Sequence, residues 1–273
     1  MRQFILEKNP DKKGIIVLGG KDYRYLHQVL RVKLGDMVSV RLPEGELKNS
    51  TVAKIDENQR AITLQLCANT NCATSYASTT RGVQASEIEH SAELGVEYWL
   101  FQFIPKPQKL EQIIRQATEC GVKKIIPVIG EYSEKSSVSS LMGPKKERLT
   151  RIIKEARQQS GSPVDTVVEE AVTLERAVEL WNPSVQTSVG FVLSEREDGD
   201  GNIRKILADK KELKRICIVC GCEGGISPQE IDFLIKKGLF YPIHFSVNIS
   251  RCETAALYGI AAVQSTFNIK DDV

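Results

Sequence analysis

The stretch between residues 216 and 263 has the residue types and the spacing of a ligand site. It opens with a β-branched apolar run, Ile216 to Cys220, which is too short for a globular helix and predicts a strand buried on both faces. Three glycines then fall within Gly221-Cys222-Glu223-Gly224-Gly225, where they allow positive φ and let a ligand approach the main chain. Ser227-Pro228-Gln229-Glu230 has the pattern of a capping box, so we expect a helix directly after this loop, ending at Gly238.

The same order of strand, loop and helix repeats directly afterwards. Tyr241 to Val247 predicts a second strand, and Ser250-Arg251-Cys252-Glu253 is a second possible capping box. The helix that follows is rich in small residues, which would let it lie close to backbone or to a partner subunit: Ala255, Ala256, Gly259, Ala261 and Ala262. Two strand-to-helix loops are therefore expected side by side at the carboxyl ends of their strands, where an open α/β sheet holds its ligand.

The first loop favours a neutral or cationic ligand over a dinucleotide. Its spacing differs from G-x-G-x-x-G, and Glu223 would repel a pyrophosphate, which argues against a nicotinamide-dependent oxidoreductase. The alternative is that these glycines serve packing alone. A metal site is not expected either, because Cys217 and Cys220 would point to opposite faces of their strand.

Composition places the chain among soluble globular proteins. Its 273 residues are 41% hydrophobic and 26% charged, enough for one large domain or two ordinary ones. No apolar run approaches the roughly 20 residues of a membrane helix, and the N-terminal residues lack the apolar core of a signal peptide. Seven scattered cysteines fit a reducing compartment, so we expect a cytoplasmic protein.

Charge is distributed unevenly along the chain. The formal net charge is +2, but residues 105–160 hold twelve basic and six acidic side chains, and residues 1–66 are also basic on balance. Such an excess is commonly a solvated face, and it also suits a polyanionic partner such as nucleic acid.

Short β-type runs separated by turn residues predict a small barrel or sandwich in residues 1–70. These runs are Gly14 to Leu18, Asp36 to Leu42, Ser50 to Ile55 and Ala61 to Leu66.

A short helix is expected between the first two of these strands, over residues 22–31. Leu26, Val29 and Leu30 would share its inner face. Arg24, His27 and Arg31 would share the outer face, where they could bind phosphate; alternatively His27 is an ordinary surface or capping histidine.

Residues 71–94 interrupt this pattern, because they are rich in Asn, Thr, Ser and Ala and poor in bulky apolar residues. We interpret them as a linker or insertion. Strands and helices then alternate through residues 95–273, which predicts an α/β domain with a mostly parallel sheet. The expected strands are Val96 to Ile104, Lys124 to Ile129, Thr166 to Val168 and Val189 to Leu193. One expected helix has Leu110, Ile113, Ile114 and Ala117 on one face and ends at Gly121, and a second lies at 144–160.

Five motifs in this order resemble the RsmE family, the 16S ribosomal RNA (uracil-N3) methyltransferases of the SPOUT superfamily. They are Pro105-Lys106, Ala117-Thr118-Glu119-Cys120-Gly121-Val122 with Ile126-Pro127, Glu155-Ala156-Arg157-Gln158-Gln159-Ser160, Gly221-Cys222-Glu223-Gly224-Gly225 and Arg251-Cys252-Glu253-Thr254-Ala255. The front of the chain is similar as well, with Arg2, His27-Gln28-Val29-Leu30-Arg31-Val32 and Gly35-Asp36. The resemblance implies a PUA-like RNA-binding β-barrel, then a SPOUT domain with a C-terminal trefoil knot that binds S-adenosyl-L-methionine. It also implies a homodimer that acts on naked 16S rRNA or the assembled small subunit.

The resemblance also assigns roles to residues. Uracil N3 must lose a proton, so Arg251 would stabilise the resulting anion while Glu223 shapes the catalytic site. The cofactor would contact Leu193, Gly221, Gly224, Gly225, Phe245, Ser246, Ile249 and Ser250. The RNA would contact Arg2, Arg24, His27, Arg31 and Arg157, and no metal is implied.

Several positions depart from the family pattern, among them Gln158, which replaces a glutamate. Cys222 replaces a proline, Ser246 a glycine, and Asn248 and Ser162 each replace an arginine. An alternative function is therefore a diverged, weakly active or inactive relative that binds rRNA or the small subunit.

Overall fold

The computed structural model describes residues 3–67, 95–138, 141, 144–182, 187–195, 202–210, 212–245 and 249–268. Two compact units are present: a first unit of residues 1–91 with 157–163, and a second unit of residues 92–156 with 164–273. The expected linker at 71–94 lies outside the described residues, as do Arg2 and Ser246.

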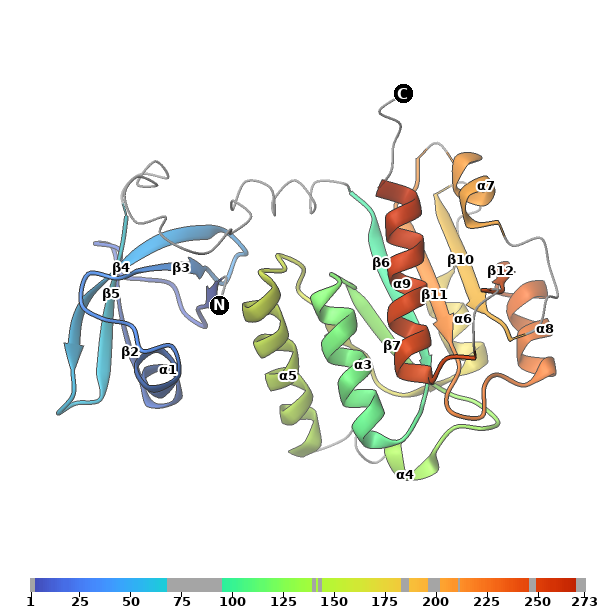
Figure 1. Ribbon diagram of the computed structural model, residues 1–273, viewed down its shortest axis with the longest axis horizontal. Helices are drawn as coiled ribbons and strands as arrows, with labels where there is room; N and C mark the ends of the chain where they lie inside the picture. Colours follow the sequence, from blue (N-terminus) through green and yellow to red (C-terminus); the bar gives the residue numbers. More distant parts are fainter. Residues whose placement is uncertain are drawn as a thin grey trace. The chain divides into compact units, whose positions relative to one another are not determined.

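The first unit is built on one curled, mainly antiparallel sheet (Figure 1). Its strands are β1 (Phe4–Ile5), β2 (Ile15–Gly19), β3 (Met37–Arg41), β4 (Leu47–Asp56) and β5 (Ala61–Leu66). They follow the order β1-β3-β4-β5-β2, and only β1 pairs parallel, with β3. Alternation along β5 buries Ile62 and Leu64 in the core, as expected for a strand with one inner face.

The helical segment of the first unit differs from the predicted helix in the position of Val29. It consists of α1 (Gly20–Arg24) and the π-helical segment η1 (Tyr25–Val29). Tyr23 and Leu26 are buried, but Val29, expected on the inner face, is 65% exposed. The backbone N–H of Leu30 donates to the carbonyl of Tyr25 at 3.0 Å, an i→i+5 bond that widens the turn and rotates Val29 outward.

The second unit contains a sheet in which all pairings are parallel, as the alternating pattern predicted. The strand order is β12-β10-β11-β6-β7-β8, and β9 also pairs with β7. The strands are β6 (Glu97–Phe103), β7 (Lys124–Ile129), β8 (Val167–Val168), β9 (Val172–Thr173), β10 (Ser188–Leu193), β11 (Arg215–Cys220) and β12 (Phe240–Ile243).

Helices cover both faces of this sheet. The core on one face includes side chains of α3 (Pro107–Glu119), α5 (Pro144–Ser160), α7 (Ile203–Ala208) and α9 (Cys252–Asn268). Helices α6 (Leu174–Trp181) and α8 (Pro228–Lys236) pack on the other face, and the short α4 spans Lys135–Val138. Figure 1 shows α3 and α9 next to each other in front of the sheet, and their residues are in contact.

Strand β11 is buried on both faces, which confirms the interpretation of its apolar run. Ile216 and Cys220 belong to the core under α3 and α9, whereas Cys217 and Val219 belong to the core under α6 and α8. Cys217 and Cys220 therefore lie on opposite sides of the sheet, as expected from the alternation of a strand.

Two boundaries in the C-terminal part differ from expectation. Strand β12 ends at Ile243, earlier than the predicted Val247. Helix α8 ends at Lys236, and the residue with left-handed φ after it is Leu239, not Gly238. Gly238 is needed for space, because a Cβ there would lie 2.8 Å from the carbonyl oxygen of Leu234.

Part of the basic excess of residues 105–160 is neutralised locally. Arg148 Nη2 lies 2.7 Å from Glu111 Oε2, and Arg115 Nη2 lies 3.8 Å from Glu155 Oε2. Among the described helices, none is both long and apolar enough to cross a membrane.

Candidate active site

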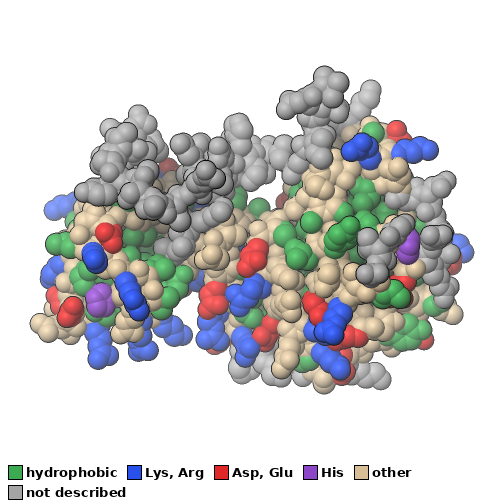
Figure 2. Space-filling model, in the orientation of Figure 1, with side chains coloured by type: hydrophobic (Ala, Val, Ile, Leu, Met, Phe, Trp, Pro, Cys, Tyr) green, Lys and Arg blue, Asp and Glu red, His purple; other side chains and the backbone are tan. Residues whose placement is uncertain are grey.

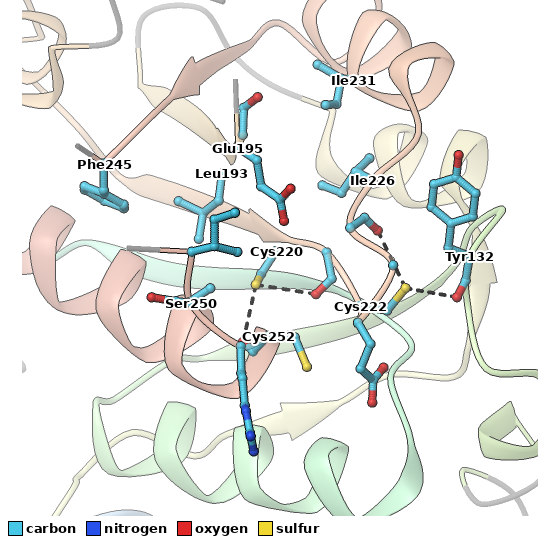
Figure 3. Close-up of a pocket in the computed structure, with 18 of the residues that line it drawn as sticks. Tyr132, Leu193, Glu195, Cys220, Cys222, Ile226, Ile231, Phe245, Ser250 and Cys252 are labelled. Atoms are coloured by element: carbon cyan, nitrogen blue, oxygen red, sulfur yellow. Dashed lines mark hydrogen bonds between the residues drawn. The ribbon is translucent and has the colours of Figure 1, made fainter. Parts of the chain in front are cut away.

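A cavity of about 580 Å³ lies at the carboxyl ends of β10, β11 and β12 (Figure 3). Its wall includes the glycine-rich loop after β11 and the segment that leads from β12 into α9. Both predicted loops therefore border one space. Their strands are not neighbours, however, because β10 lies between β11 and β12 and adds a third segment, Leu193 to Glu195.

Each of the three glycines in the first loop is required for a different structural reason. A Cβ on Gly221 would lie 2.8 Å from the carbonyl carbon of Gly225, and a Cβ on Gly224 would lie 2.8 Å from Cβ of Tyr132. Gly225 has a φ of +78°, a left-handed conformation that glycine adopts without strain. The tight turn is closed by the Gly225 N–H, which donates to the Cys222 carbonyl at 3.0 Å.

Buried side chains hold the same loop against the sheet. The Nε2 of Gln102, on β6, donates to the Gly221 carbonyl at 3.0 Å. The Cys222 thiol donates to the Tyr132 carbonyl at 3.0 Å, as Figure 3 shows. The side chain of Cys222 thus contributes a contact of its own.

Helix α8 begins with the predicted capping box. Glu230 N–H donates to Ser227 Oγ at 3.4 Å, and Ser227 N–H donates to Glu230 Oε2 at 2.9 Å. The second carboxylate oxygen of Glu230 accepts the Glu131 N–H at 2.8 Å. One side chain therefore fixes the start of α8 and the loop after β7 together.

The second loop differs in detail from its predicted capping box. The Arg251 carbonyl accepts the first backbone bonds of α9, from Thr254 and Ala255, so the helix starts one residue later than expected. The carboxylate of Glu253 binds Lys109 instead of closing a box with Ser250. The box pattern located the helix correctly to within one residue.

The small residues of α9 permit close packing on the sheet. A Cβ on Gly259 would lie 2.9 Å from Leu193 Cδ1 and 3.4 Å from Ile218 Cγ2. Tyr258 packs edge-on against Phe245, with ring centroids 4.7 Å apart. The helix thereby forms one side of the cavity.

The cofactor and catalytic residues expected from the sequence fall on this cavity, apart from the undescribed Ser246. The lining includes Leu193, Gly221, Glu223, Gly224, Gly225, Phe245, Ile249, Ser250 and Arg251. Arg251 is exposed, and Ile249 is 83% exposed at the rim.

Charged residues that the motifs did not single out also surround the cavity. Lys109 Nζ, on α3, lies 3.2 Å from Glu253 Oε2 and 3.7 Å from Glu223 Oε1. The Lys106 N–H donates to Glu223 Oε1 at 3.2 Å. Glu195 lines the cavity from the end of β10, and Figure 3 shows its side chain directed into the space.

This cluster shifts the pKa values of its members. The hydrogen bond to Glu253 raises the pKa of Lys109, against the effect of its partial burial. Burial acts to raise the pKa of Glu253, but bonds from its own backbone, from Cys252 and from Lys109 outweigh it and hold that pKa below its ordinary value. Lys109 and Glu253 are therefore both charged at neutral pH.

Four of the expected RNA-binding residues are described, and all belong to the first unit. Arg24 and Arg31 are exposed, and Arg31, two residues after the end of η1, adopts a φ of 55°. His27 stacks on Tyr23 at 5.1 Å and lies 3.9 Å from Glu57 Oε1. Arg157 is half-buried and donates from Nη2 to the Pro163 carbonyl at 3.5 Å. Figure 2 shows Lys and Arg side chains gathered along one edge of this unit.

The chain is similar to known RNA methyltransferases. Residues 92–264 match the RNA methyltransferase domain family. Ribosomal RNA small subunit methyltransferase E 2 of Borreliella burgdorferi is 26% identical over 265 residues, which cover 96% of each chain. Ribosomal RNA small subunit methyltransferase E of Rickettsia conorii is 31% identical over 161 residues, 59% of this chain and 61% of that one.

A solved structure has the same fold. The crystal structure of ribosomal RNA small subunit methyltransferase E from Neisseria gonorrhoeae, bound to S-adenosyl methionine, superposes with a TM-score of 0.71. The two chains are 20% identical, and the match covers 97% of each.

Proposed function

Because this chain belongs to the RsmE family of RNA methyltransferases, we propose that it methylates N3 of a uridine in 16S ribosomal RNA with S-adenosyl-L-methionine. The observation that carries the proposal is the cavity between the two predicted loops, whose walls match what that donor requires. Small-subunit RNA, naked or assembled, is the proposed macromolecular partner.

The cavity fits the donor in size and chemistry. About 580 Å³ is within the range of small-molecule sites, and Leu193, Ile226 and Phe245 supply apolar walls. Gly225 leaves the main chain open to close approach, because no other atom lies within 4 Å of the place a Cβ would take there. When bound, S-adenosyl-L-methionine supplies a methyl group on a cationic sulfonium, and Glu223 and Glu195 place negative charge on the same cavity.

Methylation of uracil N3 also needs a group that stabilises negative charge. The base must be unpaired or extruded, and loss of the N3 proton spreads charge over O2 and O4. Arg251 stands at the rim of the cavity, and no described carboxylate forms an ion pair with its guanidinium. We assign it to the uracil anion, where a fixed cation lowers the barrier.

The finer architecture is part of the same proposal. We assign the sheet of the first unit to a PUA-like RNA-binding barrel, with Arg2, Arg24, His27, Arg31 and Arg157 as phosphate contacts. Residues 95–273 would form the SPOUT domain, residues 71–94 a linker or insertion, and the segment from β11 through α9 a trefoil knot.

A cytoplasmic homodimer completes the proposal. Tyr258, on α9, is 45% exposed and Ile249 is 83% exposed, so apolar surface is available beside the cavity for a second copy. Family membership supports this assignment, because the resemblance implies pairing through the same segment.

The test combines donor binding with product identification. Calorimetric titration should show S-adenosyl-L-methionine binding at one site per chain. Incubation with small subunits from a strain that lacks this activity should then yield N3-methyluridine, detected by mass spectrometry of digested rRNA. Absence of donor binding, or methylation at another atom, would overturn the proposal.

A further inference from the structure

The ammonium of Lys109 joins the two cofactor loops. It lies 3.2 Å from Glu253 Oε2, in the first turn of α9, and 3.7 Å from Glu223 Oε1, in the glycine loop. The Lys109 side chain is 25% exposed and lines the cavity. One cation from α3 therefore contacts a carboxylate from each loop.

The charges at the cavity are balanced incompletely. Lys109, Arg251, Glu223 and Glu195 line the wall, and Glu253, which contacts Lys109 but does not line the wall, adds a third carboxylate. Arg251 supplies the opposing cation at the rim. The number of charges facing the ligand is small, so loss of Lys109 would change the field inside the cavity substantially.

Donor and product differ by one positive charge, and the electrostatic field of the cavity acts on that charge. S-adenosylmethionine carries a cationic sulfonium, whereas the product S-adenosylhomocysteine has a neutral thioether at the same place. The rest of the two molecules is the same apart from the methyl group. A more negative wall therefore favours the donor, and a less negative wall favours the product.

We propose that Lys109 is a positioning and specificity residue that sets the preference of the site for donor over product. This inference rests on the proposed function, since it assumes that the cavity binds these ligands. By partly neutralising Glu223 and Glu253, Lys109 limits donor preference while it holds both loops in place. Removal of Lys109 has two separable effects. Looser loops lower the affinity for donor and product alike, whereas the carboxylates left without their cation raise the affinity for the donor alone.

The experiment measures the affinity of the full-length protein for both ligands by calorimetry. In Lys109→Met, which keeps most of the aliphatic stem, we expect the donor-over-product affinity ratio to rise about three- to tenfold, as for one unit charge felt through a partly solvated wall. Lys109→Arg should leave the ratio near the wild-type value. Glu253→Gln should shift the ratio in the opposite direction, and Lys109→Met combined with Glu253→Gln should return it toward wild type.

Lys106→Met is the matched control. It removes one charge from the same helix start, but the Lys106 ammonium acts on Glu134, and its backbone N–H to Glu223 is retained. The donor-over-product affinity ratio of Lys106→Met should equal that of the wild-type protein.

The outcomes separate the inference from the function. Equal weakening of both ligands in Lys109→Met, or an unchanged ratio in both Lys109→Met and Glu253→Gln, would overturn the inference and leave the function standing. If the wild-type protein binds neither ligand, the proposed function itself is overturned. Should Lys109→Met not fold, Glu223→Gln and Glu253→Gln must both lower the ratio.

Discussion

At the scale of single residues, Arg251 and Glu223 stand on the same cavity but in different surroundings. Glu223 is held by the Lys106 N–H and by Lys109, so its orientation is fixed. Arg251 is exposed, and among the described residues no carboxylate neutralises it. A fixed carboxylate such as Glu223 can shape the site. An exposed cation such as Arg251 can stabilise the negative charge that develops on the base in the transition state.

Replacement of Arg251 should therefore affect catalysis more than folding. In Arg251→Ala we expect methyl transfer to fall about 10²- to 10³-fold, as for loss of one group that stabilises developing charge. The melting temperature should change little. A tritiated-methyl transfer assay measures the first effect; Arg176→Ala, on an exposed arginine of α6 paired with Glu179, is the matched control. Full activity of Arg251→Ala would remove this residue from the mechanism.

Cys252 gives a prediction that depends on pH. Burial raises the pKa of its thiol to about 12, with further contributions from its hydrogen bond to Glu253 and from the charge of Glu223. Only the thiolate reacts with iodoacetamide, so at pH 8.5 Cys252 should react about 10³-fold more slowly than glutathione in the same solution. Its rate should still rise tenfold per pH unit between pH 8 and 10. Peptide mapping by mass spectrometry measures this rate, and a plateau near pH 9 would contradict the assignment.

At the scale of elements, the glycine loop can be tested by adding one methyl group. In Gly221→Ala the new Cβ would meet the backbone of Gly225 at 2.8 Å, so the turn must change shape. Overpacking of this kind costs about 1–3 kcal/mol, and we expect the melting temperature to fall by several degrees and donor affinity at least tenfold. Gly19→Ala is the matched control, because its Cβ meets only the Arg60 carbonyl oxygen at 3.8 Å. Wild-type donor affinity in Gly221→Ala would show that the turn does not contact the ligand.

The sequence predicts elements well where a local pattern determines them. The apolar run of β11, the capping box of α8 and the long helix α5 lie where expected. The two-residue strands β1 and β9 were not predictable, because only their pairing partners define them. Val29 was wrongly predicted to lie on the inner face with Leu26 and Leu30, because a π-helical turn does not follow the usual helical period.

The site was predictable where motifs lie next to one another in the chain. Sequence spacing indicated the two loops, but it could not show that β10 separates their strands and brings Glu195 to the cavity. Lys109 escaped attention because its partner Glu253 is distant in sequence. Proximity of this kind is a product of tertiary structure, and a single sequence carries no direct signal for it.

At the scale of the whole molecule, a net charge of +2 is small for a protein that binds a polyanion. Some basic side chains of the second unit are paired with carboxylates, as Arg148 is with Glu111. Arg24 and Arg31 of the first unit are exposed, and Figure 2 shows basic side chains along one edge of that unit. Affinity for RNA should then depend on local clusters rather than on total charge.

The salt dependence of RNA binding tests this distribution. Each phosphate contact that is lost should reduce the slope of log affinity against log salt by about 0.7 to 0.9. We expect Arg24→Ala and Arg31→Ala each to weaken binding of a 16S rRNA fragment and to flatten this slope by that amount. Donor affinity should stay at the wild-type level, because neither residue lines the cavity. Arg60→Ala, on another residue of the first unit with left-handed φ, controls for loss of positive charge without a predicted contact. An unchanged slope in both Arg24→Ala and Arg31→Ala would show that these arginines touch no phosphate, and equal flattening in Arg60→Ala would show that charge acts without regard to position.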